Sequence, residues 1–318
     1  MIIQKKIKLY INSLMKLNKN LFFDQKKCPI CEEKDFINLG NVDGVHSDLL
    51  NLCDLLKCKN CKHFFLSKMP QENYLKDLYN SHSKYLFKKP HIENLKKKDF
   101  MKNKLKKENF QPNHWIFKNM KNDKKGNYLE IGPGECSLLK TFRNHGWHAE
   151  GYELQKRIQI EGVVHDIKKI SKKNKNVLVF HDILEHVVDP VSFLKKFSGQ
   201  QSKGDKLFLA YPNSSSFNAR ILKGKWRMVA PLSHLNFFSI SSTKILLERC
   251  GYKPLIIKET SFVYIKKLVR SILRLPITFT LDLFSLKFSQ AFKRFPEILF
   301  NILDLLKGDQ MLVIAIKK

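Results

Sequence analysis

Short apolar runs alternate with amphipathic stretches from residue 127 to the end of the chain. Runs rich in Val, Ile, Leu and aromatic side chains are typical of buried strands. They predict seven strands, at Tyr128–Ile131, Ala149–Glu153, Val163–His165, Val177–His181, Lys206–Tyr211, Pro254–Lys258 and Met311–Ile316. Apolar residues recur at helical spacing between most of them, as in Ser137–His145, Pro190–Phe197 and Ser241–Cys250. This alternation predicts an α/β fold in which helices cover both faces of a parallel sheet.

The chain divides into four parts by composition. Residues 1–27 predict a short amphipathic helix and a tether, and residues 28–66 hold four paired cysteines. Residues 67–125 predict a helical connector whose Lys-rich helix is broken near Pro112. Residues 126–318 form the α/β domain, and an apolar, basic segment at 261–307 interrupts it before the last strand. This segment predicts a helical insertion that is either a lid on the core or an amphipathic surface for a membrane or lipid-linked substrate.

The net charge of +29 raises the question of nucleic-acid binding. Only eight of the 58 basic residues are Arg, however, and specific recognition of phosphates and bases relies on the Arg guanidinium. The charge therefore favours approach to an anionic membrane surface over nucleic-acid binding. No apolar stretch has the length of a membrane span, and the N-terminus lacks a secretory pattern. We expect a cytoplasmic protein, with peripheral contact at the inner face of the membrane through 261–307 as an alternative.

Two C-x-x-C pairs lie 26 residues apart in the N-terminal part of the chain. In a chain without a secretory signal, such pairs indicate a metal site rather than disulfides. Four thiolates close a tetrahedral structural zinc site and leave no coordination position for a substrate. The predicted ligands are Cys28, Cys31, Cys58 and Cys61. Cys53 or His63 could replace one of them, and two unconnected reduced pairs are the alternative.

The stretch from Tyr128 to Ser137 carries the main sign of a ligand. An apolar strand enters a glycine turn, at Gly132 and Gly134, and a helix follows. A dinucleotide site would favour a third glycine where this chain has Ser137, and it would disfavour the strand-end carboxylate of Glu130. A cationic ligand tolerates that carboxylate. Glu153, at the end of the next strand, can accept hydrogen bonds from both hydroxyls of a ribose.

With these residues in place, the run EIGPGECSLL resembles motif I of the class I S-adenosylmethionine-dependent methyltransferases, type 11/23-like. Five later stretches resemble the same family in order, and the cysteine pairs resemble its zinc-ribbon front end. The later stretches are GYE at 151–153, VHDI at 164–167, VFHDILEHVVDP at 179–190, LFLAYPN at 207–213 and PLSHLNFFS at 231–239. The resemblance implies a Rossmann-like, mostly parallel sheet of seven strands. It implies S-adenosylmethionine binding by Glu130, Gly132, Gly134, Glu153, Asp166, Ile167, His181 and Asp182.

Methyl transfer to a hydroxyl needs a base that titrates near neutrality, which favours histidine. His234, in the loop after the fifth strand, and His186 are the candidate catalytic bases. Packing or capping roles for both remain open. The resemblance to enzymes of surface-polysaccharide pathways suggests a small, sugar-like or nucleotide- or lipid-linked glycan acceptor, with carbon or nitrogen acceptors less favoured. It leaves the oligomeric state open.

Three alternatives accompany this interpretation. Asp182, Glu185 and His186 form a D-x-x-E-H pattern that resembles the metal-associated stretch of quinone O-methyltransferases, which would act on a quinone or lipid with a divalent ion. A helical spacing would put the three side chains on one face. An RNA-binding or RNA-methylating zinc-ribbon protein is disfavoured because the ribbon lacks interleaved aromatic and basic residues. A scaffold without catalysis would bind no cofactor.

Overall fold

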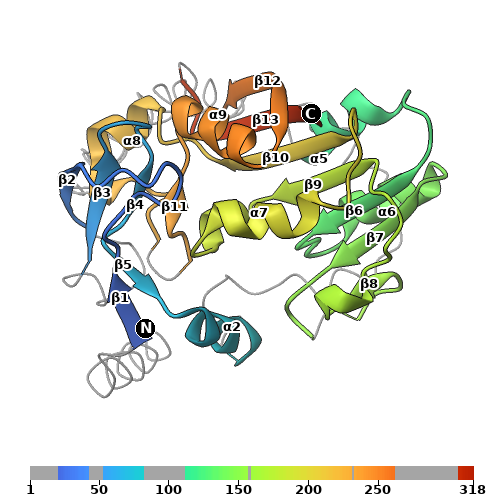
Figure 1. Ribbon diagram of the computed structural model, residues 1–318, viewed down its shortest axis with the longest axis horizontal. Helices are drawn as coiled ribbons and strands as arrows, with labels where there is room; N and C mark the ends of the chain where they lie inside the picture. The colour runs from blue at the N-terminus through green and yellow to red at the C-terminus, as the bar shows by residue number, and fades with distance from the viewer. Residues whose placement is uncertain (1–20, 43–52, 82–111, 157–158, 231–232, 262–306) are drawn as a thin grey trace, which may run out of the picture.

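The computed structural model describes residues 21–42, 53–81, 112–156, 159–230, 233–261 and 307–318, and the description below concerns these residues. A seven-stranded sheet forms its centre, in the order β12-β13-β10-β9-β6-β7-β8 (Figure 1). The strands are β6 (Asn127–Ile131), β7 (His148–Tyr152), β8 (Val163–Val164), β9 (Val177–His181), β10 (Lys206–Pro212), β12 (Tyr252–Thr260) and β13 (Gln310–Lys317). Only β13 runs antiparallel to its neighbours. The predicted seven-stranded, mostly parallel Rossmann-like sheet is confirmed.

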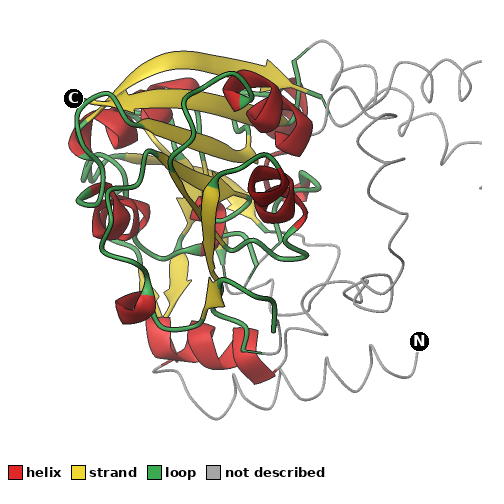
Figure 2. Ribbon diagram, turned by 90° about the vertical axis from the view of Figure 1, so that its right-hand side faces the viewer, coloured by secondary structure: helices red, strands yellow, loops and turns green. Residues whose placement is uncertain are grey.

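Helices cover both faces of this sheet (Figure 2). Side chains alternate along each strand, so neighbouring residues enter two separate apolar layers. On β6, Tyr128 packs in the layer with α5 (Pro112–Met120) and α6 (Ser137–Asn144), whereas Leu129 packs in the layer with α7 (Pro190–Ser198) and α9 (Ile240–Arg249). The predicted helices are therefore present with nearly the predicted bounds.

Proline marks the start of one helix where the sequence predicted a break. Pro112 opens α5, because a first-turn position needs no backbone N–H donor. Pro190 does the same in α7, and the Asp189 side chain caps that helix by accepting the Ser192 N–H at 2.9 Å. Gly146 and Gly251 follow α6 and α9 with positive φ angles of 81° and 77°, as expected for glycines that end helices.

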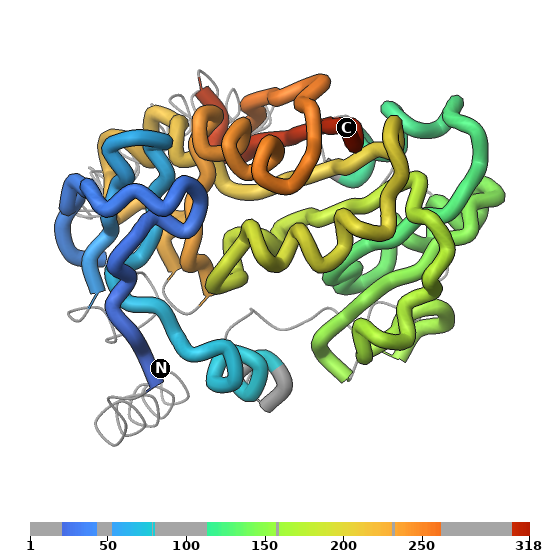
Figure 3. The backbone as a smooth tube through the Cα atoms, in the orientation of Figure 1, coloured from blue at the N-terminus to red at the C-terminus, as the bar shows by residue number. Residues whose placement is uncertain are grey.

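The cysteine segment forms a second, four-stranded sheet in the order β11-β4-β3-β2. Three of its strands are β2 (Phe36–Asn41), β3 (Asp54–Cys58) and β4 (Phe64–Leu66). The fourth, β11 (Asn236–Phe237), comes from the α/β domain and pairs antiparallel with β4. The tube in Figure 3 shows the blue N-terminal segment beside this later part of the chain. The segment 28–66 thus shares its sheet with the α/β domain.

The predicted helical connector begins with a strand instead. β5 (Lys68–Pro70) pairs antiparallel with β1 (Phe22–Asp24), and the helix α2 (Glu72–Ser81) follows. A strand this short has too little apolar periodicity to be recognised in the sequence. Two short helices complete the described residues, α8 (Phe217–Leu222) and the turn η5 (Leu184–His186), with further 3₁₀ turns at Ile167–Lys169 and Lys223–Lys225.

Several predictions on the helical segments lie outside the described residues. These are the N-terminal helix of 1–27, the Lys-rich helix before Pro112 and the insertion 261–307, of which only the ends are described. No helix within the described ranges is both long and apolar enough to cross a membrane.

Candidate active site

The carboxyl ends of β6 and β7 meet at the glycine turn that the sequence singled out. Gly132 (φ 65°) and Gly134 (φ 50°) have left-handed backbone conformations, and the Gly132 N–H donates to the Tyr152 carbonyl at 2.8 Å. A Cβ on Gly132 would stand 2.1 Å from the end of the Ile183 side chain, which would have to move, and the left-handed φ itself favours glycine. A Cβ on Gly134 would meet no atom within 4 Å. The free space at this turn is therefore at Gly134.

A buried carboxyl lies beneath the turn. Glu130, near the end of β6, is 4% exposed, and the Tyr128 hydroxyl donates to its Oε2 at 3.1 Å. Burial raises the pKa of Glu130 to about 7, against the smaller opposing effects of His181 and Tyr128. A positively charged group nearby would favour the ionised carboxylate.

A second buried carboxyl follows β7. Glu153 is 7% exposed, and its Oε1 accepts the Gln155 N–H at 2.9 Å. Burial raises its pKa above the ordinary value, although backbone donors that include Gly134 oppose this effect. The backbone around it is fixed, because the Glu153 N–H donates to the Val164 carbonyl of β8 at 3.0 Å. Glu153 thus has a defined position beside Gly134.

Asp166 and Ile167 lie just after β8, the strand at one edge of the central sheet. Asp166 caps the 3₁₀ turn at Ile167–Lys169, where its Oδ1 accepts the Lys168 N–H at 2.9 Å. Both residues are exposed, Ile167 to 36%. An exposed apolar side chain beside a carboxylate is an available surface for a flat heteroaromatic ring.

His181 ends β9 and interacts electrostatically with Glu130, and Asp182 follows it. The His181 Nε2 lies 3.3 Å from the Asp182 Oδ2, and its Nδ1 lies 2.9 Å from the Asn113 Oδ1. Asn113 belongs to α5, and its amide also donates to the Ser137 hydroxyl at 3.1 Å. Asn113 could not be predicted from the sequence, because a residue 68 positions from His181 gives no local signal of this contact. Asn113 joins α5 to the carboxyl end of the sheet.

The two candidate bases lie close together. The ring centroids of His186 and His234 are 4.8 Å apart. The His186 Nδ1 lies 2.5 Å from the Ser233 carbonyl oxygen, and the His234 Nδ1 lies 2.7 Å from the Met228 carbonyl oxygen. A carbonyl only accepts, so each Nδ1 carries the hydrogen and each Nε2 keeps its lone pair. Burial, with the neighbouring His234, lowers the pKa of His186 to about 3, and burial lowers the pKa of His234.

Glu185 completes a compact group with the two histidines. It is 1% exposed, and neither carboxylate oxygen has a hydrogen-bond partner among the described residues. Its Oε1 lies 3.8 Å from the His186 Nε2. One ligand atom from each of Glu185, His186 and His234 lies within 4.8 Å of the others. Burial and the nearby Asp182 raise the pKa of Glu185 well above its ordinary value.

The expected helical face of Asp182, Glu185 and His186 is wrong. Residues 184–186 form a 3₁₀ turn, and Asp182 stands before it with a left-handed φ of 54°. Its carboxylate is half-exposed and pairs with His181. In the compact group, His234 takes the place that the sequence pattern gave to Asp182.

The four paired cysteines converge as the sequence predicted. The sulfurs of Cys28 and Cys61 are 3.5 Å apart, as are those of Cys31 and Cys58, and all four lie within 4.8 Å of one another. Each pair is followed by a residue with positive φ, Glu32 (63°) and Lys62 (60°). The backbone N–H of each of these residues donates to the first cysteine of its pair, at 2.9 and 3.2 Å. These separations suit four thiolates around one zinc ion.

Comparison with known proteins gives a family match. The family model described as a methyltransferase domain matches residues 67–256. No curated protein matches the chain.

Solved structures of similar fold have low sequence identity to this chain. A methyltransferase from Mesorhizobium loti is 12% identical, covers 65% of this chain and 98% of its own, and has a TM-score of 0.44. A methyltransferase from Archaeoglobus fulgidus is 14% identical, with 64% and 94% covered and a TM-score of 0.43. The magnesium protoporphyrin IX methyltransferase of Synechocystis with bound SAH is 11% identical, with 78% and 100% covered and a TM-score of 0.46.

Proposed function

Since this chain belongs to the methyltransferase domain family, as the resemblance to S-adenosylmethionine-dependent methyltransferases predicted, we propose that it methylates a hydroxyl of a small or glycan-linked acceptor. The cofactor would occupy the carboxyl end of β6 and β7. The acceptor would approach from the side of His186 and His234. A sugar-like acceptor on a nucleotide or lipid carrier is the class that the resemblance suggests.

The open space at Gly134 is the observation that carries the cofactor assignment. The turn leaves room there, and two buried carboxyls at the ends of the adjoining strands, Glu130 and Glu153, form no salt bridge among the described residues. Buried carboxyls are costly unless something compensates them. An ammonium or sulfonium group beside Glu130 and two ribose hydroxyls on Glu153 would provide that compensation.

The remaining cofactor residues have matching chemistry. The side chain of Asp166 and the backbone of Ile167 would hold the adenine, because a carboxylate accepts from an exocyclic amine. His181 and Asp182 would line the methionine end, where Asn113 holds the His181 ring. S-adenosylmethionine, when bound, supplies a methyl group that its sulfonium has already activated.

The acceptor side has to align a hydroxyl and take its proton. Both candidate bases, His186 and His234, are neutral imidazoles whose Nδ1 faces a backbone carbonyl. We assign the proton transfer to the Nε2 of His234, because a pKa of about 3 makes His186 a weak base at neutral pH. Replacing the base by glutamine should slow methyl transfer by about 10²- to 10⁴-fold. Binding of S-adenosylhomocysteine should stay unchanged, because neither ring lies in the cofactor half of the site.

Blocking the open space tests the cofactor assignment. Asparagine tolerates a left-handed backbone, so Gly134→Asn should fold but fill the space with its side chain. The matched control is Gly146→Asn, at a helix end that also has positive φ and no atom within 4 Å of a Cβ. Calorimetry with S-adenosylhomocysteine should show binding by the control and at least about a hundredfold weaker binding by Gly134→Asn. Equal affinities would remove the site.

The acceptor class needs its own assay. Transfer of a labelled methyl group should be measured to sugar nucleotides, lipid-linked sugars and catechol-type quinone precursors, with His148→Gln as a control for the histidine variants, since His148 is exposed on β7. Methylation of a glycan hydroxyl is the expected result. Transfer only to the quinone precursors would favour the alternative function.

A divalent ion is the second candidate, and the Glu185 group favours it. A buried carboxylate without a hydrogen-bond partner among the described residues, beside two imidazoles whose Nδ1 atoms donate to carbonyls, is typical of a metal site with oriented ligands. The ion would hold an acceptor oxygen and favour loss of its proton. Binding of one equivalent of Mn²⁺ should disappear in Glu185→Gln and persist in Asp182→Asn. Unchanged Mn²⁺ binding in Glu185→Gln would exclude the ion.

We assign a structural role to zinc at the four cysteines. Three of their side chains are buried, and the four sulfurs close a tetrahedral set. The segment has little apolar core of its own, so a metal would contribute to its folding.

A further inference from the structure

We propose that His63 and Asn236 are positioning residues that connect the cysteine site to the histidine pair on the acceptor side. This inference rests on the proposed function, in which His186 and His234 face the acceptor. It adds that the zinc module forms part of the active-site wall.

The second cysteine pair, Cys58 and Cys61, contacts His63 through the backbone. The Cys58 N–H donates to the His63 carbonyl at 2.9 Å, so the second C-x-x-C turn holds the backbone of His63. The Ser239 hydroxyl donates to the Cys61 carbonyl at 2.7 Å, and Ser239 also caps α9. A bound metal that holds Cys58 and Cys61 in place therefore also fixes His63 and the start of α9.

A hydrogen bond between buried side chains connects His63 to Asn236. Both side chains are fully buried, with exposed fractions of 0%. The His63 Nε2 lies 3.0 Å from the Asn236 Oδ1, and the Asn236 amide donates to the Val187 carbonyl at 2.6 Å. The amide nitrogen of Asn236 is a donor, so its Oδ1 is free to accept from the His63 Nε2–H. One buried side chain thus contacts the module on one side and the segment after His186 on the other.

The histidine pair lies beside β11 rather than on it. β11 lies between β4 and the η5 turn, because the Leu235 N–H donates to the Glu185 carbonyl at 2.7 Å and the Leu66 N–H donates to the Leu235 carbonyl at 3.2 Å. His234 directly precedes Leu235, and His186 directly precedes Val187. Any shift of β11 therefore moves both imidazoles relative to each other. The spacing of the pair depends on a contact that the zinc module provides.

Changing His63 tests this connection without removing a cysteine. His63→Leu removes the donor to Asn236, whereas His63→Gln retains a side-chain N–H. Loss of one buried hydrogen bond increases local opening by about tenfold. Amide hydrogen exchange in residues 183–189 and 233–239 should rise by about that factor in His63→Leu. It should stay near wild type in His63→Gln and in the control Asn38→Ala, whose hydrogen bond to Asp54 is exposed and remote from β11.

Two further measurements make the result specific. The ¹⁵N imidazole signals of His186 and His234 should shift in His63→Leu, while zinc content and the affinity for S-adenosylhomocysteine stay unchanged. If His63→Leu does not fold, Asn236→Asp provides the same test, since it keeps the acceptor for His63 and loses the donor to Val187.

Unchanged exchange and unchanged imidazole signals in folded His63→Leu or Asn236→Asp would overturn the proposal. Equal deprotection of residues 127–153 would also overturn it, because that result indicates general destabilisation rather than positioning. These readouts do not need methyl transfer. Failure of the wild type to bind S-adenosylhomocysteine would count against the proposed function alone.

Discussion

At the scale of single residues, the buried Glu130 gives the site a pH dependence. Its pKa is raised from 4.5 to about 7 by burial, so the folded state disfavours the ionised form. Without ligand, the contribution of Glu130 to the free energy of unfolding should be largest below about pH 4.5, and it should be lost as the pH rises to about 7. The shift corresponds to about 3 kcal/mol. A cationic ligand would reverse this by stabilising the carboxylate.

Glu130→Gln isolates that effect. Urea unfolding at pH 8 should show a variant more stable than the wild type by up to about 3 kcal/mol, and the difference should vanish toward pH 4.5. Its affinity for S-adenosylmethionine should nevertheless fall. Glu135→Gln is the control, because Glu135 lies in the same turn but is exposed. If the difference in free energy of unfolding between the wild type and Glu130→Gln did not change between pH 5 and pH 8, the assignment would be wrong.

The residues of the candidate site differ in how well the sequence predicted their surroundings. Glu130, Gly132, Gly134 and Glu153 lie at or just after strand ends, which are local features that a sequence reveals. Asn113 could not be found this way, since only the folded α5 places its side chain at His181. The two glycines also looked equivalent in the sequence. The structure separates them, because one packs against Ile183 and the other faces open space.

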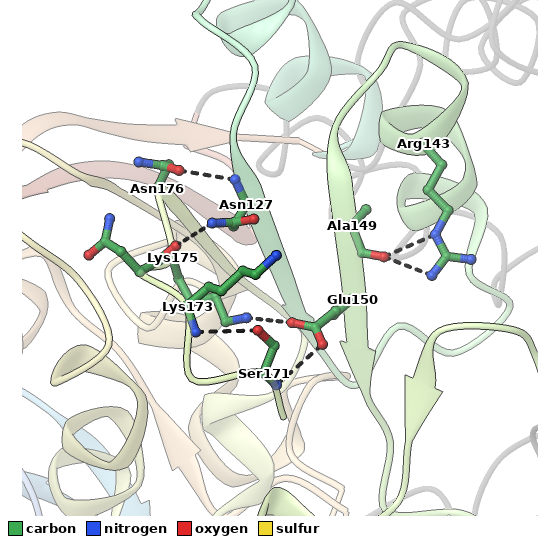
Figure 4. Close-up of polar contacts among 9 residues, drawn as sticks. Asn127, Arg143, Ala149, Glu150, Ser171, Lys173, Lys175 and Asn176 are labelled. Atoms are coloured by element: carbon green, nitrogen blue, oxygen red, sulfur yellow. Dashed lines mark hydrogen bonds and ion pairs between the residues drawn. The ribbon is translucent and has the colours of Figure 1, made fainter. Parts of the chain in front are cut away.

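At the scale of elements, the amino-terminal side of the sheet carries a buried ion pair. Figure 4 shows Lys175, just before β9, directed at Glu150 of β7, with Ser171 beside them. The Lys175 side chain is 1% exposed, whereas Glu150 is 28% exposed. This asymmetry decides which partner can be removed. An unpaired ammonium would stay buried, but an unpaired carboxylate could still contact water.

Glu150→Gln should therefore destabilise the protein by about 3–5 kcal/mol, the usual cost of leaving a buried charge without its partner. Lys175→Met should cost clearly less, because methionine fills a similar volume without charge. Chemical denaturation of both variants measures the difference. Equal losses would contradict the argument. Affinity for S-adenosylhomocysteine should be unchanged in both, since the pair lies away from the carboxyl ends of the strands.

Elements were predictable in proportion to their length and periodicity. All seven strands of the central sheet and α6, α7 and α9 have regular apolar patterns and lie where the sequence placed them. β11 has two residues and β5 has three, and both gain their hydrogen bonds from distant segments. The helical spacing expected for Asp182, Glu185 and His186 is absent, because residues 184–186 form the 3₁₀ turn η5. The left-handed backbone of Asp182 is incompatible with a helix at that residue.

At the scale of the whole molecule, the cysteine segment and the α/β domain form one structure around β11. The sequence indicated two units, because cysteine spacing and strand–helix alternation are separate local patterns. Neither pattern reports that Asn236 and Phe237 complete the module's sheet. The Arg249 guanidinium adds a second contact between them, donating to the Ile30 carbonyl at 2.5 Å and pairing with Glu32. The two parts should consequently unfold together.

Removing one zinc ligand tests this union. Cys58→Ser should release the metal and lower the free energy of unfolding by several kcal/mol, since a structural zinc site contributes its binding energy to folding. The control is Cys53→Ser, which changes a buried thiol of the same sheet region outside the four-sulfur group. Because β11 connects the module to Glu185 and Val187, the loss should reach the α/β domain. Calorimetry should then show one transition that shifts as a whole in Cys58→Ser. An α/β transition at the wild-type temperature, with only a separate module signal lost, would mean that the two parts are energetically independent.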